Sequence, residues 1–560
     1  MRRDLRMLWR QVRHEFAVLR STPIVIILAV AFPLAFFVLI AAVVGNATID
    51  DRSGVRVAQF LAPAFASFGV VMSTFSFLGA GLAEARALGI VKRQNGTPLP
   101  RWVMLGGRMG AALLLGLAST ALIVAVGAAL YDVQIIGRTL LAVAVTIVVA
   151  SLAFSALGIA VAAVASTPQV AQALTNGLVI PLAFISDIFT FGGTGMPRWL
   201  SSVGWVFPLK HLVNAIGDAF NPFIGGSGFA WGHLAVIAAW GAAGAATSAW
   251  LLRASRERSE TRASGVGRSR RADASPRSAG RPGVWALLVD QVSHTCIGQL
   301  REFSAFFFSV AFPVLLVVLV PATAGGADTV LDNGLALPTF LAGTMAIYGA
   351  AVTGFVSVAE GVAEDRGRGV LKRAHGSPLP KWALLTGRVA GAVALSSVTL
   401  VGCYAVAGLV YRSPIPSSLP TVLVVLVLSA ACFAALGLAV VSLVRTAQSV
   451  IGISLGTLLP LSFISDVFIV GADFPAAIDR VSWLFPLRHA TSAITDAALA
   501  PGLGGGFDLA HLGVLVAWTL AGVLVVARRF AWEGTPGRRR TVRAPARPVP
   551  AGRRGSTLDG

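Results

Sequence analysis

The side chains that could do chemistry are few, and their spacing fits no catalytic or metal-binding motif. The three cysteines, Cys296, Cys403 and Cys432, lie in the second half without metal-ligand spacing, so we interpret them as packing residues rather than a disulfide framework. Six of the seven histidines recur in pairs, but they form no close ligand cluster in the sequence. We expect them to form hydrogen bonds at helix ends and predict no metal site. The pairs are His14 with His294, His211 with His489, and His233 with His511.

The lysines exclude a nucleotide site of the P-loop kind. Such a site needs a glycine-rich loop closed by Gly-Lys-Ser or Gly-Lys-Thr. None of the four lysines, Lys92, Lys210, Lys372 and Lys381, follows a glycine. The sequence also has no nucleophile elbow and no soluble domain large enough to hold an active site. We therefore expect no enzyme activity and no cofactor bound by this chain; if ATP drives it, another polypeptide hydrolyses the ATP.

A charged, turn-rich segment occurs twice, at a constant spacing of 280 residues. Residues 89–108 read GIVKRQNGTPLPRWVMLGGR and residues 369–388 read GVLKRAHGSPLPKWALLTGR, each between long apolar runs. A plain hairpin would need the prolines and glycines but not the charges, so we favour docking of a partner over a plain connector. The matched positions are Glu84, Arg86, Gly89, Lys92, Arg93, Gly96, Pro98, Pro100 and Trp102, and then Glu364, Arg366, Gly369, Lys372, Arg373, Gly376, Pro378, Pro380 and Trp382.

A second segment is also repeated, near the end of the fifth apolar run of each half. Residues 181–187 read PLAFISD and residues 460–466 read PLSFISD. A carboxylate at membrane depth faces a cavity or a partner, whereas one in outer-face water needs no such role, and the sequence leaves both interpretations open. The candidates for a substrate path or an outer gate are Pro181, Phe184, Asp187, Pro460, Phe463 and Asp466. The apolar segments that follow predict short helices that dip back into the outer leaflet.

Composition places these segments in a bilayer. The chain has 560 residues, of which 56% are hydrophobic and only 12% charged, about half the charged share of a soluble domain, which is about 25%. The net charge of +20 does not indicate nucleic-acid binding, because the basic residues cluster at the flanks of apolar runs. Such clustering is typical of cytoplasmic membrane flanks. Arginine-rich tails could also bind anionic lipid head groups.

Apolar runs of about 20 residues predict about 12 transmembrane helices in an all-α polytopic fold. Each half has an even number of runs, so both halves enter and leave on the basic, cytoplasmic side as parallel six-helix repeats. Amphipathic helices at the membrane interface precede each first span, where apolar residues recur every three or four positions. The predicted units are a first transmembrane domain (1–253), a flexible basic cytoplasmic linker (254–283), a second transmembrane domain (284–530) and a disordered basic cytoplasmic tail (531–560). The predicted spans are 23–45, 57–80, 107–131, 139–165, 168–190, 232–252, 304–324, 337–359, 387–411, 419–444, 449–470 and 508–527.

The order of these features resembles the ABC-2 type exporter permeases. The shared features are six spans per unit, an interface helix before the first, a Glu-x-Arg-x-x-Gly loop with Pro-Leu-Pro after the second, and a Pro-x-x-Phe-Ile-Ser segment at the end of the fifth. The resemblance implies that residues 89–104 and 369–384 are coupling helices that seat in two ATP-binding subunits. It also implies that Glu84 with Arg86, and Glu364 with Arg366, transmit the motion, while the fused halves replace the usual permease dimer.

Two positions depart from the family pattern. The family loop often has a glutamate where Lys92 and Lys372 stand, and often a glycine where Asp187 and Asp466 stand. The first departure changes the ionic part of docking, and the second suggests an altered outer gate or an affinity for cationic cargo.

The leading hypothesis is therefore a permease subunit that exports a hydrophobic or amphipathic small molecule, such as a drug, an antibiotic or a lipid. Its expected partners are two copies of a cytosolic ATP-binding subunit, which hold ATP and magnesium, together with membrane lipids and no nucleic acid. Its expected location is the cell membrane, with both termini cytoplasmic. The alternatives are an ion-coupled secondary multidrug transporter, which expects charged residues in mid-membrane, and a membrane scaffold without transport.

Overall fold

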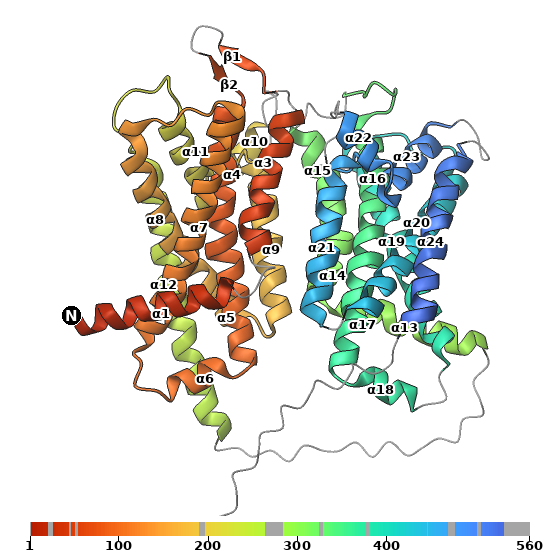
Figure 1. Cartoon of the computed structure of the whole chain (residues 1–560), viewed down its shortest axis with the longest axis horizontal. Coiled ribbons are helices and arrows are strands. Elements are labelled where there is room, and N and C mark those ends of the chain that lie inside the picture. Colours follow the sequence, from red (N-terminus) through yellow and green to blue (C-terminus); the bar gives the residue numbers. More distant parts are fainter. Residues whose placement is uncertain are drawn as a thin grey trace, which may run out of the picture.

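The chain folds into two helical halves that stand side by side in the computed structural model (Figure 1). The structure describes residues 2–20, 26–43, 46–50, 54–189, 197–263, 284–323, 329–376, 380–444, 446–468, 476–500 and 506–530. The short helices α6 and α18 lie at one end of the two halves, and α11 and α23 lie at the opposite end (Figure 1). We refer to these as the α6/α18 end and the α11/α23 end.

The first half begins with α1 (Arg2–Arg20), which lies across the direction of the other helices (Figure 1). A two-stranded antiparallel ribbon of β1 (Thr48–Asp50) and β2 (Val55–Arg56) follows the first apolar helix at the α11/α23 end. The other elements are η1 (Ile27–Ala31), α3 (Phe32–Val43), α4 (Ala58–Val71), η2 (Met72–Phe77), α5 (Leu78–Ala87), α6 (Ile90–Asn95), α7 (Arg101–Tyr131), η3 (Gly137–Thr139), α8 (Leu140–Val164), α9 (Pro168–Ile185), α10 (Arg198–Gly204), α11 (Pro208–Phe220) and α12 (Trp231–Ala263).

The second half repeats this order of helices. An isolated antiparallel bridge between Val330 and Ala336 stands where the first half has its ribbon. The elements are α13 (Val284–Arg301), α14 (Phe303–Phe306), η4 (Phe307–Ala311), α15 (Phe312–Thr323), α16 (Leu337–Ala351), η6 (Val352–Ser357), α17 (Val358–Gly367), α18 (Val370–His375), α19 (Lys381–Tyr411), α20 (Leu419–Leu443), α21 (Ala447–Ile464), α22 (Ala476–Ser482), α23 (Pro486–Leu499) and α24 (Leu509–Arg529).

The predicted class of a helical polytopic membrane protein is confirmed. Among the described residues, nine helices are long and apolar enough to cross a membrane, and the shorter apolar helices 29–42, 307–322 and 449–464 occupy the remaining predicted spans. The short helices expected after each fifth span are present as α10 and α11, and as α22 and α23. Helix α12 continues to Ala263, into the predicted linker, while residues 264–283 and 531–560 lie outside the described part of the chain.

Two spans of each half contain a π-helical turn at the same place. In the first span, Pro33 and Pro313 lack the N–H that an α-helix would donate to the carbonyl four residues earlier, and the π-turns η1 and η4 precede these prolines. In the second half, the freed Ser309 carbonyl accepts a hydrogen bond from Thr399 Oγ1 at 3.1 Å. The sequence pattern of apolar residues does not distinguish these turns from α-helix.

The second and fourth spans of each half approach backbone to backbone. A Cβ atom added at Gly158 would lie 2.7 Å from the Phe75 carbonyl oxygen, and one at Gly437 would lie 2.4 Å from the Gly354 carbonyl oxygen. Lipid provides no hydrophobic force between helices, so small residues that permit close packing stabilise such contacts. These glycines set the position of the second span, which leads directly into the repeated loop.

We predict that Gly437→Ala separates α20 from η6 and lowers the thermal unfolding temperature in detergent, because overpacking of this kind costs about 1–3 kcal/mol. The matched control is Gly456→Ala on the adjacent helix α21, where an added Cβ meets no atom within 4 Å. The control should unfold at the wild-type temperature or slightly above it. Equal unfolding temperatures for the two variants would contradict this account of the packing.

Candidate functional site

The two repeated loops fold into the same short basic helix. Helices α6 and α18 each follow a glycine in the left-handed region, with φ of 69° at Gly89 and 71° at Gly369. A glycine adopts this conformation without the steric penalty of a side chain. The helices then end at Gly96 and Gly376. The chain can therefore turn sharply out of the second span into a short helix, which packs Val91 or Leu371 against the core of its own half and exposes its basic residues.

The basic and aromatic residues of these loops lie on the surface. The side chains of Lys92, Arg93, Lys372 and Arg373 are exposed. The indoles of Trp102 and Trp382, at the start of the third spans, are 53% and 46% exposed. Pro98 is exposed, Pro100 and Pro380 directly precede α7 and α19, and Pro378 lies outside the described residues. A cationic surface with an aromatic edge is therefore offered twice at the same end of the molecule.

The same kind of contact in each half links this loop to the fourth span. Arg86 donates through Nη1 to the Ala162 carbonyl near the end of α8. Arg366 donates through Nη1 to the carbonyls of Val441 and Val444 at the end of α20, at 2.9 and 3.1 Å. The last carbonyls of a helix have no partner within the helix, and a cation is favourable at this negative end of the helix dipole. The arginines thus fix the second span to the fourth beside the loop.

The paired glutamates of the same motif differ between the halves. Glu84 is exposed. Glu364 pairs with Arg368 at 2.8 Å and accepts a hydrogen bond from Gln169 Nε2 at 3.4 Å. Gln169 belongs to α9 of the first half, so Glu364 forms a polar contact between the halves.

Gly107 and Gly387 of the repeated motif lie against the interface helices α1 and α13, and in the first half Arg108 does so too. A Cβ atom at Gly107 would lie 2.3 Å from Gln11 Cγ, and one at Gly387 would lie 2.4 Å from Gln291 Cβ. The next residue, Arg108, pairs with Glu15 of α1 at 3.5 Å. These positions therefore pack α1 and α13 against the third spans. The signal for these contacts in the sequence is the repeat of Gln11 as Gln291, 280 residues later.

The phenylalanines of the two fifth spans pack into opposite halves. Phe463 of the second half is buried in the core of the first half, where its ring centroid lies 3.8 Å from that of Phe36. Phe184 of the first half packs against the core of the second half and lies 5.0 Å from Phe189. Phe468 lies 4.9 Å from Phe463. Phe184 and Phe463, which we call the exchanged phenylalanines, therefore join the two halves. Pro181 and Pro460 lie within the same fifth-span helices, α9 and α21.

The two aspartates of the fifth-span segments carry ion pairs. Asp187 Oδ2 lies 3.1 Å from Lys210 Nζ, which is almost fully buried, and Asp466 pairs with Arg488. Both aspartates have positive φ, 64° and 55°. The next residue in each case donates its N–H to the carbonyl five positions earlier, as in a Schellman C-cap. A glycine suits this backbone position best, and here an aspartate occupies it to hold a cation from α11 or α23.

Three glutamates of the second half form an acidic group that the sequence pattern did not indicate. Glu360 lies in the second span and interacts electrostatically with Glu302 and Glu364. Burial and the Glu364 carboxylate raise the pKa of Glu302. The first half has Thr22 and Ala80 at the positions of Glu302 and Glu360. Their spacing of 58 residues in the sequence gave no sign that these carboxylates would meet.

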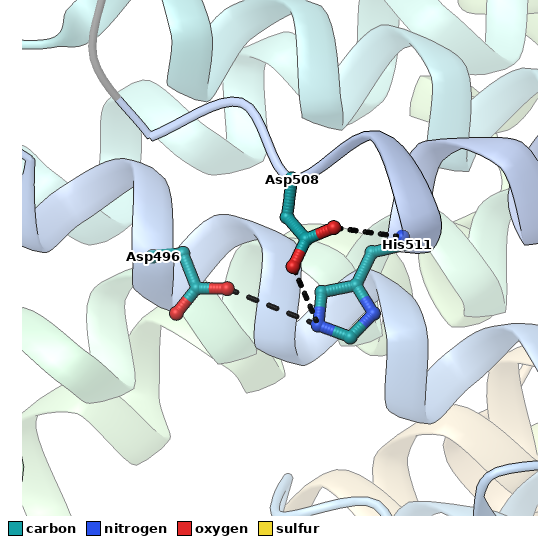
Figure 2. A group of neighbouring side chains, drawn as sticks. All are labelled: Asp496, Asp508 and His511. Atoms are coloured by element: carbon teal, nitrogen blue, oxygen red, sulfur yellow. Dashed lines mark hydrogen bonds and ion pairs between the residues drawn. The ribbon is translucent and has the colours of Figure 1, made fainter.

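Histidine pairs occupy the α11/α23 end of both halves. His211 Nδ1 lies 2.9 Å from His233 Nδ1, and His489 Nδ1 lies 3.0 Å from His511 Nδ1. Burial lowers the pKa of His489. In the second half, Asp496 and Asp508 lie beside His511 (Figure 2). Burial raises the pKa of Asp496, while the Ala510 N–H donated to Asp508 lowers the pKa of that carboxyl.

Comparison with known families found a match in each half. Residues 6–220 match the family described as ABC-2 type transporter, and residues 332–528 match the family described as ABC-2 family transporter protein. The first match contains α6 and the Phe184 segment, and the second contains α18 and the Phe463 segment. None of the curated proteins compared matches this chain.

We predict that Asp187→Asn lowers stability by about 1–3 kcal/mol, because the buried Lys210 ammonium loses its counter-charge. Asparagine still tolerates the left-handed backbone. The matched control is Asp132→Asn, which also has positive φ but pairs with Arg56 across an exposed surface at 3.3 Å. Its effect should stay below about 1 kcal/mol. Thermal unfolding in detergent measures both, and an equal loss in the two variants would refute the importance of the buried pair.

Proposed function

Because this chain belongs to the ABC-2 type transporter permeases, with two permease units fused in one polypeptide, we propose that it is the transmembrane subunit of an ATP-driven exporter. Permeases of this kind are transmembrane components that work with ATP-binding subunits. The observation that carries the proposal is the presentation of the same exposed basic helix, α6 and α18, at the same end of both halves (Figure 1).

In this proposal, α6 and α18 each seat in one copy of a cytosolic ATP-binding subunit. The two partner subunits hold ATP and magnesium. The α6/α18 end then faces the cytoplasm, and both termini are cytoplasmic in the cell membrane, in keeping with the excess of basic residues at that end. Lys92 and Lys372 occupy the surface that meets the partner, so the complementary groove on the ATP-binding subunit is acidic.

The contacts around the loops support a path for the motion. Movement of α6 or α18 acts on the adjoining end of the second span, and the arginines that cap the fourth spans carry it to α8 and α20. The exchanged phenylalanines join the halves towards the α11/α23 end. Rocking of one half against the other would separate these rings and release a substrate held between the halves. The apolar composition of the spans suits a hydrophobic or amphipathic small molecule.

We predict that Lys92→Glu combined with Lys372→Glu weakens assembly with the ATP-binding subunit about tenfold or more, because like charges then face each other across the contact. Co-purification and ATPase activity in lipid vesicles measure the effect. The matched control is Arg138→Glu, an exposed basic residue at the α11/α23 end. Assembly that survives the double reversal, or that fails equally in the control, would argue against docking through α6 and α18.

We also predict that Phe184→Ala combined with Phe463→Ala uncouples ATP hydrolysis from transport, because the aromatic contact between the halves at this position is lost. Substrate should leak across vesicles without ATP, while assembly with the ATP-binding subunit is retained. The control is Phe223→Ala, whose ring is 55% exposed. Tight vesicles and normal coupling in the double variant would count against a gate at these rings.

A second candidate function, ion-coupled transport, is favoured by the acidic group of Glu302, Glu360 and Glu364. Glu360 lies within the second span, and ionisable residues inside spans are typical of proton and cation pathways. The two functions separate in vesicles that hold the permease with its ATP-binding subunit. Uptake that needs ATP and persists after the proton gradient is collapsed supports the exporter, and the reverse result supports ion coupling.

A further inference from the structure

The second half carries a ligand set that the first half lacks, at the α11/α23 end. Asp496 of α23 and Asp508 and His511 at the start of α24 point towards one another (Figure 2). The His511 Nε2 atom lies 3.9 Å from Asp496 Oδ2 and 3.8 Å from Asp508 Oδ2. One imidazole nitrogen and two carboxylate oxygens therefore converge from two helices that are separated by a loop.

The Nε2 atom of His511 faces the carboxylates, and the hydrogen bonds outside this group determine whether it carries a hydrogen. The Trp483 carbonyl can only accept, so His489 Nε2, at 2.8 Å, must carry a hydrogen. In neutral His489 the Nδ1 atom is then an acceptor, and His511 Nδ1, at 3.0 Å, must donate to it. A neutral His511 consequently presents the lone pair of Nε2 to Asp496 and Asp508. A metal-binding histidine is typically fixed in this way by the hydrogen bond of its other nitrogen.

The Asp508 carboxylate has one oxygen available beside His511 Nε2. Asp508 caps α24 with Oδ1, which accepts from the N–H groups of Ala510 and His511 at 2.7 and 3.4 Å. Its other oxygen, Oδ2, is the one that faces His511. The cap therefore orients this side chain and leaves one oxygen for a ligand.

The first half supplies an internal comparison. It keeps the histidine pair as His211 and His233, it keeps Asp218 at the position of Asp496, and it keeps the Trp205 carbonyl contact at 2.9 Å. It has Ala230 where the second half has Asp508. One carboxylate beside a histidine balances a single imidazolium charge. Two carboxylates leave an excess negative charge, which a divalent cation on a neutral imidazole would offset.

We propose that Asp496, Asp508 and His511 bind a divalent transition-metal ion of the zinc class, completed by water. Imidazole with carboxylate is a donor set suited to Zn²⁺. The donor atoms all lie within 4.8 Å of one another. Around a tetrahedral zinc they would approach to about 3.4 Å, so binding draws the three side chains closer together. The bound ion ties α23 to the start of α24 in the second half only.

The test uses the full chain, purified in detergent without a histidine tag and freed of metal with a chelator. Titration with Zn²⁺ and elemental analysis should give one ion more per wild-type chain than per Asp508→Asn chain. Asparagine is an equally good helix cap, so this variant keeps α24 and loses only the charged ligand. Asp496→Asn should give the same loss. His489→Gln should bind zinc roughly 10- to 100-fold more weakly, because the hydrogen bond that orients His511 is altered.

A second experiment tests whether the first half can be made to bind zinc. Ala230→Asp gives the first half the missing carboxylate, and this chain should bind one zinc ion more than the wild type. Wild-type and Asp508→Asn chains that bind equal amounts of zinc would overturn the proposal and leave Asp508 as a helix cap with an ordinary histidine pair. Misfolding of either asparagine variant leaves the Ala230→Asp chain to decide, because no gain there would equally refute the site. None of these readouts depends on transport or on the ATP-binding subunit.

Discussion

A backbone carbonyl without a hydrogen-bond donor inside a bilayer costs several kcal/mol, because no water is present to replace the lost partner. Many of the specific polar contacts in this fold answer that constraint. Thr399 donates to the carbonyl that Pro313 leaves open, Arg366 donates to the end of α20, and Lys210 lies 3.5 Å from the Ile185 carbonyl at the end of α9. Each donor comes from a different helix than the acceptor. Satisfying the backbone therefore also fixes which helices are neighbours.

The same constraint explains which parts of the fold the sequence predicted. Apolar runs long enough to span a bilayer are easily read from composition, and all twelve predicted runs contain a described apolar helix. The repeat predicted two equivalent loops, and the family expected from them is confirmed by the matches in both halves. The π-helical turns were not predicted: those of the first spans depend on a single proline, Pro33 or Pro313, and those of the second spans have no proline beside them.

The sequence predicted the candidate site as one set of positions, but the structure shows that these residues make different kinds of contact. Lys92 and Lys372 are exposed, whereas Arg86 and Arg366 bond to helix ends within their own half. Phe184 and Phe463 cross to the opposite half, which no local pattern indicates. Asp187 pairs with Lys210, which is more than twenty residues later in the sequence. Contacts of this kind depend on how the helices pack, and the local pattern of residues along the chain does not reveal that packing.

The two halves are alike in backbone but unlike in charge. Glu302, Glu360 and Asp508 have the uncharged counterparts Thr22, Ala80 and Ala230. In a symmetric dimer of identical subunits every substitution appears twice, once on each side of the axis. Fusion of the two units removes that restriction, so a carboxylate in one half need not face a copy of itself in the other half. The fused chain can therefore hold a charged group in one half alone, which a symmetric dimer of identical subunits cannot do.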